Sequence, residues 1–290
     1  MKKIDKNTIV VSSIDTFQTK DKVENRRIKV DALPGQTKKY INDGIITTRW
    51  NPNYKGILTR LSETEEVIEE MYCMATVINV SDIRMNRIDV NTDINIEFGE
   101  ISKQLDMLFM SITEGMSKSR KEWIDKDKLE KEAYWLGTQY IEVNFYNKKR
   151  ACESSGEKFE YPTRLELRFK KIKSQDKKFH IDKAIKVYNE ALERFKYAEE
   201  TRIKALCREW DIFKKDNPKG TLTHFVVRYE REIYTRRILQ NLYEYVGLKG
   251  SFKSWVDKFK RGYKLELITE TEMKELIKRI NISLKRYKNN

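Results

Sequence analysis

The strict alternation of polar and apolar residues in three separate segments constrains the fold most. These segments are residues 84–98, 139–149 and 162–171. Successive side chains of a β-strand point to opposite faces, so each segment predicts a strand with one polar and one apolar face. The apolar faces must be buried. We therefore expect the three strands in one antiparallel sheet with helices packed on one face, an α+β fold.

The polar face of this sheet is predicted to gather acids, bases and a tyrosine. Asp and Asn are disfavoured in strands, so Asp89, Asn91 and Asp93 on one strand face indicate a chemical role, with a solvated strand face as the alternative. The side chains expected on this face are Arg87, Asp89, Asn91, Asp93, Glu142, Asn144, Tyr146, Lys148, Arg164, Glu166 and Arg168. Clustered carboxylates suit Mg²⁺ or Mn²⁺. A tyrosine among cations suits phosphodiester chemistry.

Other patterns predict a hairpin over residues 44–61 and mostly helical structure after residue 181. The expected helices are 63–76, 99–115, 181–214, 222–246, 251–261 and 270–287. The first 25 residues are polar and weakly periodic, and we expect them to be partly mobile. Residues 116–131 match no pattern. His180 and His224 are assigned to structure because their separation rules out a paired-histidine metal motif.

Positive charge is concentrated in the C-terminal part of the chain. Residues 171–290 contain 30 lysines and arginines against 17 acids, and these account for +13 of the net charge of +14. Such an excess favours an anionic partner, most often nucleic acid. We therefore expect an α+β domain over residues 1–175 and a basic helical domain for DNA binding or oligomerisation over residues 176–290.

One helical segment of the basic region is a candidate DNA-binding element. Phe252, Trp255, Val256 and Phe259 form an apolar stripe, and the cations Lys253, Lys260 and Arg261 lie off it. Contact with phosphates requires no special geometry, whereas insertion into the major groove is a more specific alternative. The structural alternative is that this stripe packs into a hydrophobic core and has no role in DNA binding.

Cysteine content and hydropathy predict a cytoplasmic protein without membrane contact. The three cysteines lack the spacing of a disulfide framework or a zinc site. No run of eighteen apolar residues is present, and no apolar stretch of signal-peptide length follows the first residues.

Two segments also carry a family resemblance. Phe145-Tyr146-Asn147-Lys148-Lys149 followed by Thr163-Arg164-Leu165-Glu166-Leu167 resembles the trans-acting replication initiators of Gram-positive rolling-circle plasmids and the related relaxases of integrative conjugative elements. Upstream, Trp135-Leu136-Gly137-Thr138 and Arg87-Ile88-Asp89 are similar to earlier strands of that family. The match spans roughly residues 84–171. The resemblance implies a nicking-endonuclease or relaxase-like fold, with residues 1–175 as a nicking-type catalytic domain.

The resemblance implies a nicking mechanism. Tyr146 would be the nucleophile that forms a 5′-phosphotyrosyl link and leaves a 3′-OH primer at a plasmid or element origin. A divalent metal, Mg²⁺ or Mn²⁺, would be held by acids, with Asp89, Glu142 and Glu166 as the candidates. The cations expected to contact DNA are Lys148, Lys149, Arg164, Arg168, Lys253, Lys260 and Arg261.

Partners and an alternative follow from the same resemblance. The expected partners are origin DNA, host replication proteins such as a helicase, and a second copy of the chain. The sequence departs from the family in its short segment between Gly137 and Tyr146 and in Ala151, where the family has a glutamate. Ala151 favours the alternative of a non-catalytic origin-binding initiator or partition protein that recruits host replication proteins.

Overall fold

The computed structural model describes most of the chain. The described residues are 4, 7–22, 36–42, 45–51, 61, 85–116, 121–125, 130–148, 160–172, 174, 176–263 and 265–290. The predicted helix over 63–76 and the second half of the predicted hairpin lie outside these residues. Among the described helices, none has both the length and the apolar character needed to cross a bilayer.

One antiparallel sheet organises the molecule. Its order is β2-β3-β1-β4-β8-β7-β6-β5. The strands are β1 (Val10–Lys22), β2 (Gln36–Asn42), β3 (Ile45–Asn51), β4 (Met85–Ile94), β5 (Lys121–Asp125), β6 (Glu130–Gly137), β7 (Ile141–Asn147) and β8 (Thr163–Lys170). The three predicted strands form neighbouring positions β4, β8 and β7, which confirms the expected sheet.

The N-terminal segment was expected to be partly mobile, but most of it forms a strand. Residues 10–22 form β1, which pairs with both β4 and β3. The weak periodicity has a physical cause, because β1 is irregular in register between Ile14 and Thr16 and again near Gln18. An irregularity of this kind breaks the strict alternation that sequence patterns detect. The first half of the predicted hairpin forms β3, which pairs with β2 and β1, whereas residues 54–60 lie outside the described residues.

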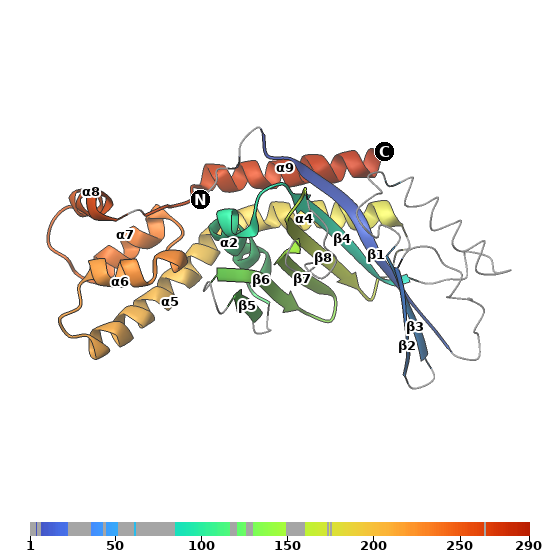
Figure 1. The fold of residues 1–290 in the computed structure, drawn as a ribbon, viewed down its shortest axis with the longest axis horizontal. Helices are drawn as coiled ribbons and strands as arrows, with labels where there is room; N and C mark the ends of the chain where they lie inside the picture. Colours follow the sequence, from blue (N-terminus) through green and yellow to red (C-terminus); the bar gives the residue numbers. More distant parts are fainter. Residues whose placement is uncertain are drawn as a thin grey trace.

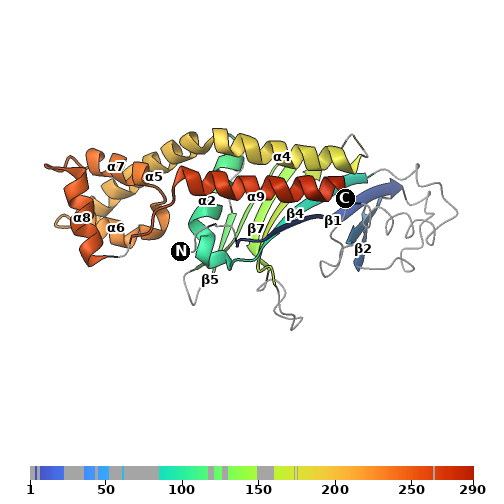
Figure 2. The same ribbon diagram turned by 90° about the horizontal axis from the view of Figure 1, so that it is seen from above.

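Helices form a layer over one face of the sheet and then extend beyond it (Figure 1). They are α2 (Ser102–Thr113) after a 3₁₀ turn (Phe98–Ile101), α4 (Lys177–Glu193), α5 (Phe195–Asp216), α6 (Leu222–Arg228), α7 (Arg236–Tyr245), α8 (Phe252–Gly262) and α9 (Glu270–Asn289). α4 and α9 run side by side along the sheet and pack on each other (Figure 2).

Several boundaries differ from the sequence prediction. The predicted strand 139–149 begins two residues later, at Ile141, because Thr138 closes the turn before it by accepting from the backbone N–H groups of Tyr140 and Ile141. The segment 181–214 is two helices that meet at Arg194, and 222–246 is divided into α6, a 3₁₀ turn and α7. Periodicity continues across such breaks, so it does not locate them. The helices 99–115, 251–261 and 270–287 are confirmed within a few residues.

The core lies between the apolar sheet face and the helices. Phe109 of α2 contacts the rings of Phe145 and Tyr134, each with ring centroids 5.5 Å apart. In the neighbouring strand β8, Phe169 lies beside His180 of α4. His180 is buried and its Nε2 lies 2.9 Å from the carbonyl oxygen of Ser174, so its role is structural, as expected.

The helical half is attached to the sheet half by buried polar contacts. Lys103 of α2 donates to the carbonyl of Glu266 at 2.7 Å, and Tyr234 donates to Asp106 of α2. Because α4 and α9 also cover the sheet, residues 176–290 supply much of the core of residues 1–175. The division into two domains at residue 175 stays a prediction.

Candidate polar site on the sheet

The strand registers place the predicted polar side chains on one face of the sheet, in transverse rows. Residues directly opposite each other in a sheet share a face. One row contains Asp89, Arg168 and Glu142, and the next contains Asn91, Glu166 and Asn144. A third row contains Asp93, Arg164 and Tyr146. The shared face of Asp89, Tyr146 and Glu166, predicted from the parity of polar residues, is therefore confirmed. The expected closeness of Asp89 to Tyr146 is not, because their rows are four residues apart along β8.

The charged side chains on this face are buried, which corrects the expectation of an open face. Asp89 is 0% exposed and Glu166 is 2% exposed, and Glu142 and Arg164 are also buried. Burial of a charge is unfavourable unless it is paired and hydrogen-bonded. The acids and bases of the three strands satisfy that requirement by bonding to one another.

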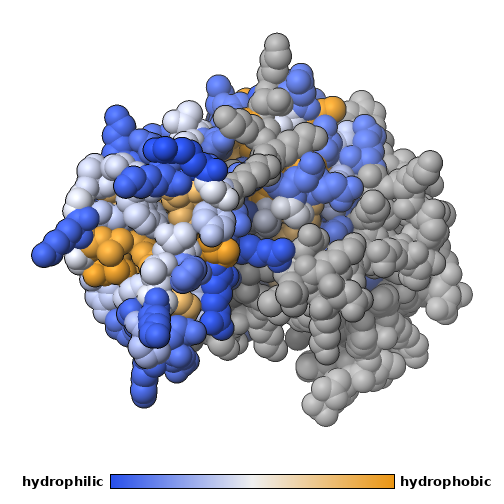
Figure 3. Space-filling model, turned by 60° about the vertical axis from the view of Figure 1, so that its left-hand side comes forward, coloured by the Kyte–Doolittle hydropathy of each residue, from blue (hydrophilic) through white to orange (hydrophobic). Residues whose placement is uncertain are grey.

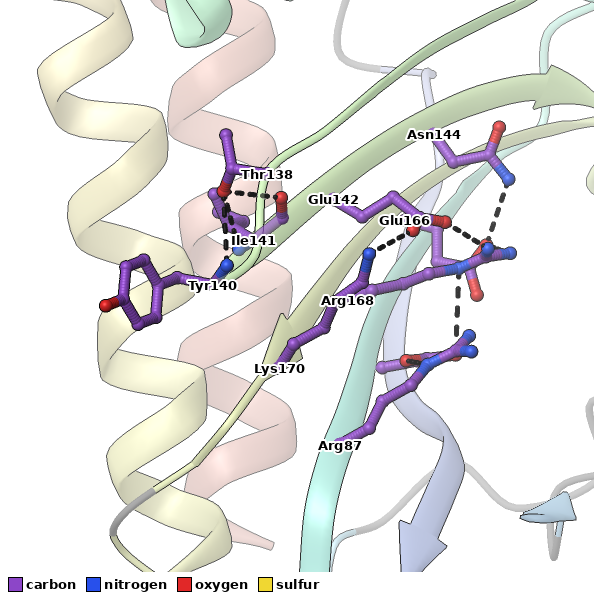
Figure 4. Close-up of polar contacts among 10 residues, drawn as sticks. Arg87, Thr138, Tyr140, Ile141, Glu142, Asn144, Glu166, Arg168 and Lys170 are labelled. Carbon is purple, nitrogen blue, oxygen red and sulfur yellow. Dashed lines mark hydrogen bonds and ion pairs between the residues drawn. The ribbon is translucent and has the colours of Figure 1, made fainter. Parts of the chain in front are cut away.

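Arg168 lies at the centre of three carboxylates. It donates to Glu142 and, at 2.8 Å, to Glu166, and its Nε lies 3.8 Å from Asp89. Figure 4 shows Arg168 reaching between Glu142 and Glu166, which come from neighbouring strands. Two outer cations complete the cluster, since Arg87 bonds Asp89 and the Nζ of Lys170 lies 2.6 Å from Glu142.

The cluster perturbs its acids unequally. Burial and the nearby charge of Glu166 raise the pKa of Asp89 to about 7, although Arg87 and Arg168 act in the opposite direction. For Glu142, burial raises the pKa, but bonds to Lys170 and Arg168 outweigh it and lower the pKa to about 2. Glu166 is also buried, and Arg168 and Arg164 hold its pKa below the usual value. The charge is thus least well compensated at Asp89.

The arrangement does not fit a metal ion bound jointly by Asp89, Glu142 and Glu166. Their oxygens are of the hard type that Mg²⁺ and Mn²⁺ prefer. However, the guanidinium of Arg168 lies in the space on which the three carboxylates converge. Within the described part of the chain, no group of three or more His, Cys, Asp or Glu side chains is placed to hold a metal. The predicted Mg²⁺ or Mn²⁺ therefore stays a prediction without a preformed site in these residues.

Tyr146 shares its row with Asp93, and not with the predicted metal ligands Asp89 and Glu166. It is directly opposite Arg164, whose Nε and Nη2 donate to the two oxygens of Asp93 at 2.7 and 2.8 Å. Lys148 also donates to Asp93, at 2.9 Å. Burial raises the pKa of Asp93, but the charges and bonds of Arg164 and Lys148 outweigh it, so the pKa lies below its ordinary value.

The sequence placed Asp93 on the polar face, but Asp93 was not among the predicted catalytic, metal-binding or DNA-binding residues. Strand rise puts Asp89 about 13 Å further along the sheet than the row of Tyr146, because four residues separate their partners Arg168 and Arg164. Only the register between β4, β8 and β7 shows that Asp93 shares a row with Tyr146. The polar parity of Asp93 was visible in the sequence, but the identity of its row was not.

The predicted DNA-binding cations occupy three environments. Arg164 and Arg168 are engaged in the ion pairs above, and Lys148 bonds Asp93. Lys149 lies outside the described residues. The remaining three, on α8, are exposed: Lys253, Lys260 and Arg261. The apolar stripe of α8 is confirmed, since Val256 and Phe259 are buried and the other two side chains are partly buried against the core.

Comparison with known proteins gives one similar solved structure to report. Its title is "Structure of Rolling Circle Replication Initiator Protein from Geobacillus stearothermophilus". The match has 14% sequence identity and a TM-score of 0.31, and it covers 56% of this chain and 74% of that chain. Such a similarity assigns no activity and no residue role. No protein-family model and no curated protein sequence matches the chain.

Proposed function

We propose that this chain is a DNA-binding replication initiator of a plasmid or mobile element, and that it nicks its origin with Tyr146. The observation that carries the proposal is the row formed by Tyr146, Arg164 and Asp93, with Lys148 bound to the same acid. It places a tyrosine directly opposite Arg164, on the strand that leads to Lys148, and both cations bind one carboxylate.

The chemistry follows from these residue types. The oxygen of Tyr146 attacks the phosphorus of a backbone phosphodiester, and its proton is lost to solvent or a nearby base. A bond forms between the tyrosine oxygen and phosphorus, and the bond from phosphorus to the 3′ oxygen breaks. The products are a 5′-phosphotyrosyl link and a 3′-OH that can prime synthesis. Arg164 and Lys148 would stabilise the negative charge that develops on the phosphate oxygens.

Asp93 has a positioning role in this proposal. Both oxygens of its carboxylate bind Arg164, so the guanidinium is held in one orientation. Fixed donors stabilise a transition state better than mobile ones because they need no reorganisation. Asp93 also keeps the two cations close together, because Lys148 and Arg164 both bind its carboxylate.

The test is covalent capture of DNA. The protein is incubated with supercoiled DNA from its own element, with Mg²⁺ or Mn²⁺ present, and nicked circles carrying bound protein are sought. Tyr146→Phe should abolish the adduct and leave binding nearly unchanged, because only a hydroxyl is lost. Tyr140→Phe is the matched control, since Tyr140 is 57% exposed and points away from the cluster (Figure 4). An adduct formed by Tyr146→Phe at the wild-type level would refute the assignment.

Metal dependence is a separate part of this test. If the proposal holds in full, a chelator stops nicking and added Mg²⁺ or Mn²⁺ restores it. Nicking that is indifferent to the chelator would remove the metal from the proposal and leave Tyr146 in place. This arm is needed because Arg168 lies where the three predicted ligands meet.

A non-catalytic initiator or partition protein is the second candidate. The observation that favours it is the pairing of the acids and bases on this face with one another, which is also what a purely structural ion-pair layer would look like. Under this alternative the wild-type protein binds origin DNA tightly and yields no covalent adduct with any tested metal. Host replication proteins such as a helicase, and a second copy of the chain, are proposed partners under both candidates.

A further inference from the structure

A cleft of about 750 Å³ lies at the end of the molecule that is drawn at the left of Figure 1. One wall comes from the end of α5 and the start of α6, and the other from the α7–α8 loop and the start of α8. Its volume falls in the range of about 300–1,000 Å³ that is usual for ligand sites. In Figure 3, which brings this end forward, hydrophilic side chains surround small hydrophobic areas.

The cleft is strongly cationic. Within the described part of the chain its lining includes four lysines, Lys214, Lys219, Lys249 and Lys258, and no Asp or Glu. Lys214 donates to the carbonyls of Pro218 and Gly220 and so fixes the turn that forms one wall. The other three lysines are exposed and form no ion pair with any described residue. Such a group, on two facing walls, attracts a polyanion.

The lining also offers aromatic rings and hydroxyls. Trp210 and Tyr243 are largely buried, and Trp255 is partly exposed. Trp255 is held by ring contacts to Tyr243 at 5.6 Å and Phe259 at 5.4 Å between centroids, so its orientation is fixed. Thr221, Thr223, Ser251 and Ser254 add hydroxyl groups to the same lining. Unpaired bases stack on aromatic rings of this kind, while hydroxyls and lysines bind phosphates.

Resting on the DNA-binding function proposed above, we infer that this cleft binds a segment of single-stranded DNA. Lys219, Lys249 and Lys258 contact successive phosphates, and a base stacks on Trp255. This assigns DNA contact to a different surface of α8 from the one predicted by its sequence. Ser254, Trp255 and Lys258 line the cleft, whereas Lys253 and Lys260 do not.

The experiment compares two triple variants of the full-length protein with equal loss of charge. The first, Lys219→Ala/Lys249→Ala/Lys258→Ala, empties the cleft of its unpaired cations. The second, Lys204→Ala/Lys215→Ala/Lys278→Ala, removes exposed lysines of α5 and α9 that lie outside the lining and have no DNA contact assigned to them. Binding of a fluorescent thymidine oligonucleotide is measured by anisotropy over a range of salt concentrations. Matching circular dichroism spectra establish that both variants are folded.

At low salt the cleft variant should bind about tenfold more weakly for each lost contact. The slope of the logarithm of its binding constant against the logarithm of salt concentration should become less negative by about 2. The control variant should change much less. Wild-type binding should also quench tryptophan fluorescence, and Trp255→Phe should reduce the quenching.

Three results would overturn the inference. The first is an equal loss of affinity in the two triple variants. The second is that the cleft variant loses more affinity for a duplex of the same length than for the single strand. The third is that the wild type does not bind the oligonucleotide. The covalent-capture assay separates this failure from failure of the proposed function. If the cleft variant binds the oligonucleotide normally and the Tyr146 adduct still forms, the cleft inference is refuted and the proposed function is not.

Discussion

Asp93 and its two cations are the most informative residues of the polar face. Asp93 accepts from both Arg164 and Lys148, and the row that contains it also contains Tyr146. By contrast, Asp89 and Glu166 belong to the group around Arg168. The polar face thus has two neighbouring ionic groups, and only the first of them includes the candidate nucleophile.

At the residue scale, Asp93→Asn should destabilise the protein in a pH-dependent way. The folded-state pKa of Asp93 is depressed, so its ionised form contributes stability above the unfolded value of about 3.9. That contribution is lost as pH falls through the lower, folded-state pKa. We expect a loss of about 3 kcal/mol at pH 7, because the change leaves Arg164 without its buried partner, and little difference from wild type in strong acid.

Urea denaturation of both proteins from pH 7 down to pH 3 measures this difference. Asp257→Asn, an exposed carboxylate on α8, serves as the control and should stay within about 0.5 kcal/mol of wild type. A difference between Asp93→Asn and wild type that is the same at every pH would show that the carboxylate charge is not what stabilises the row.

At the element scale, α9 connects the C-terminal end of the chain to the sheet. It packs on α4 and on β1, and buried residues along its length include Met273, Ile280 and Tyr287. Its start is fixed by a capping box, in which Thr269 accepts from the backbone of Glu272 and the Glu272 side chain accepts from the backbone of Thr269. The helix expected over residues 270–287 thus begins at the predicted residue, Glu270.

Thr269→Ala should therefore lower the free energy of unfolding by about 1 kcal/mol, the usual effect of losing an N-cap. The matched control is Thr271→Ala, which changes a threonine in the same turn that has no capping role. Thermal unfolding followed by circular dichroism gives both values. If the two variants unfold at the same temperature, the cap does not limit the stability of α9.

At the scale of the whole molecule, the sheet depends on helices encoded far away in the chain. The apolar sides of β1, β4 and β8 face α4 and α9, which belong to the basic C-terminal half. Further contacts tie that half to α2, such as those of Lys103 and Tyr234. The positive charge and the covering of the sheet thus reside in the same segment.

A fragment of residues 1–175 should consequently fail to fold on its own. Without α4 and α9 it would expose Val90, Leu167 and Phe169, and each large apolar side chain contributes about 1.5–3 kcal/mol when buried. Size-exclusion chromatography and circular dichroism would reveal aggregation or loss of structure. A monomeric fragment that unfolds cooperatively would instead support an independent N-terminal domain.

The sequence by itself determined which side chains share a face and where several helices begin. The period of two in β4, β7 and β8 is a local property of each strand, so Asp89, Tyr146 and Glu166 could be placed on one face before their neighbours were known. Capping at Thr269 is equally local. The tertiary structure alone decided that Arg168 lies among the three acids and that Asp93 shares a row with Tyr146. It also decided that lysines of α5, α8 and the loops beside them line one cleft. Strand register and helix packing depend on contacts between distant segments, and no local pattern records them.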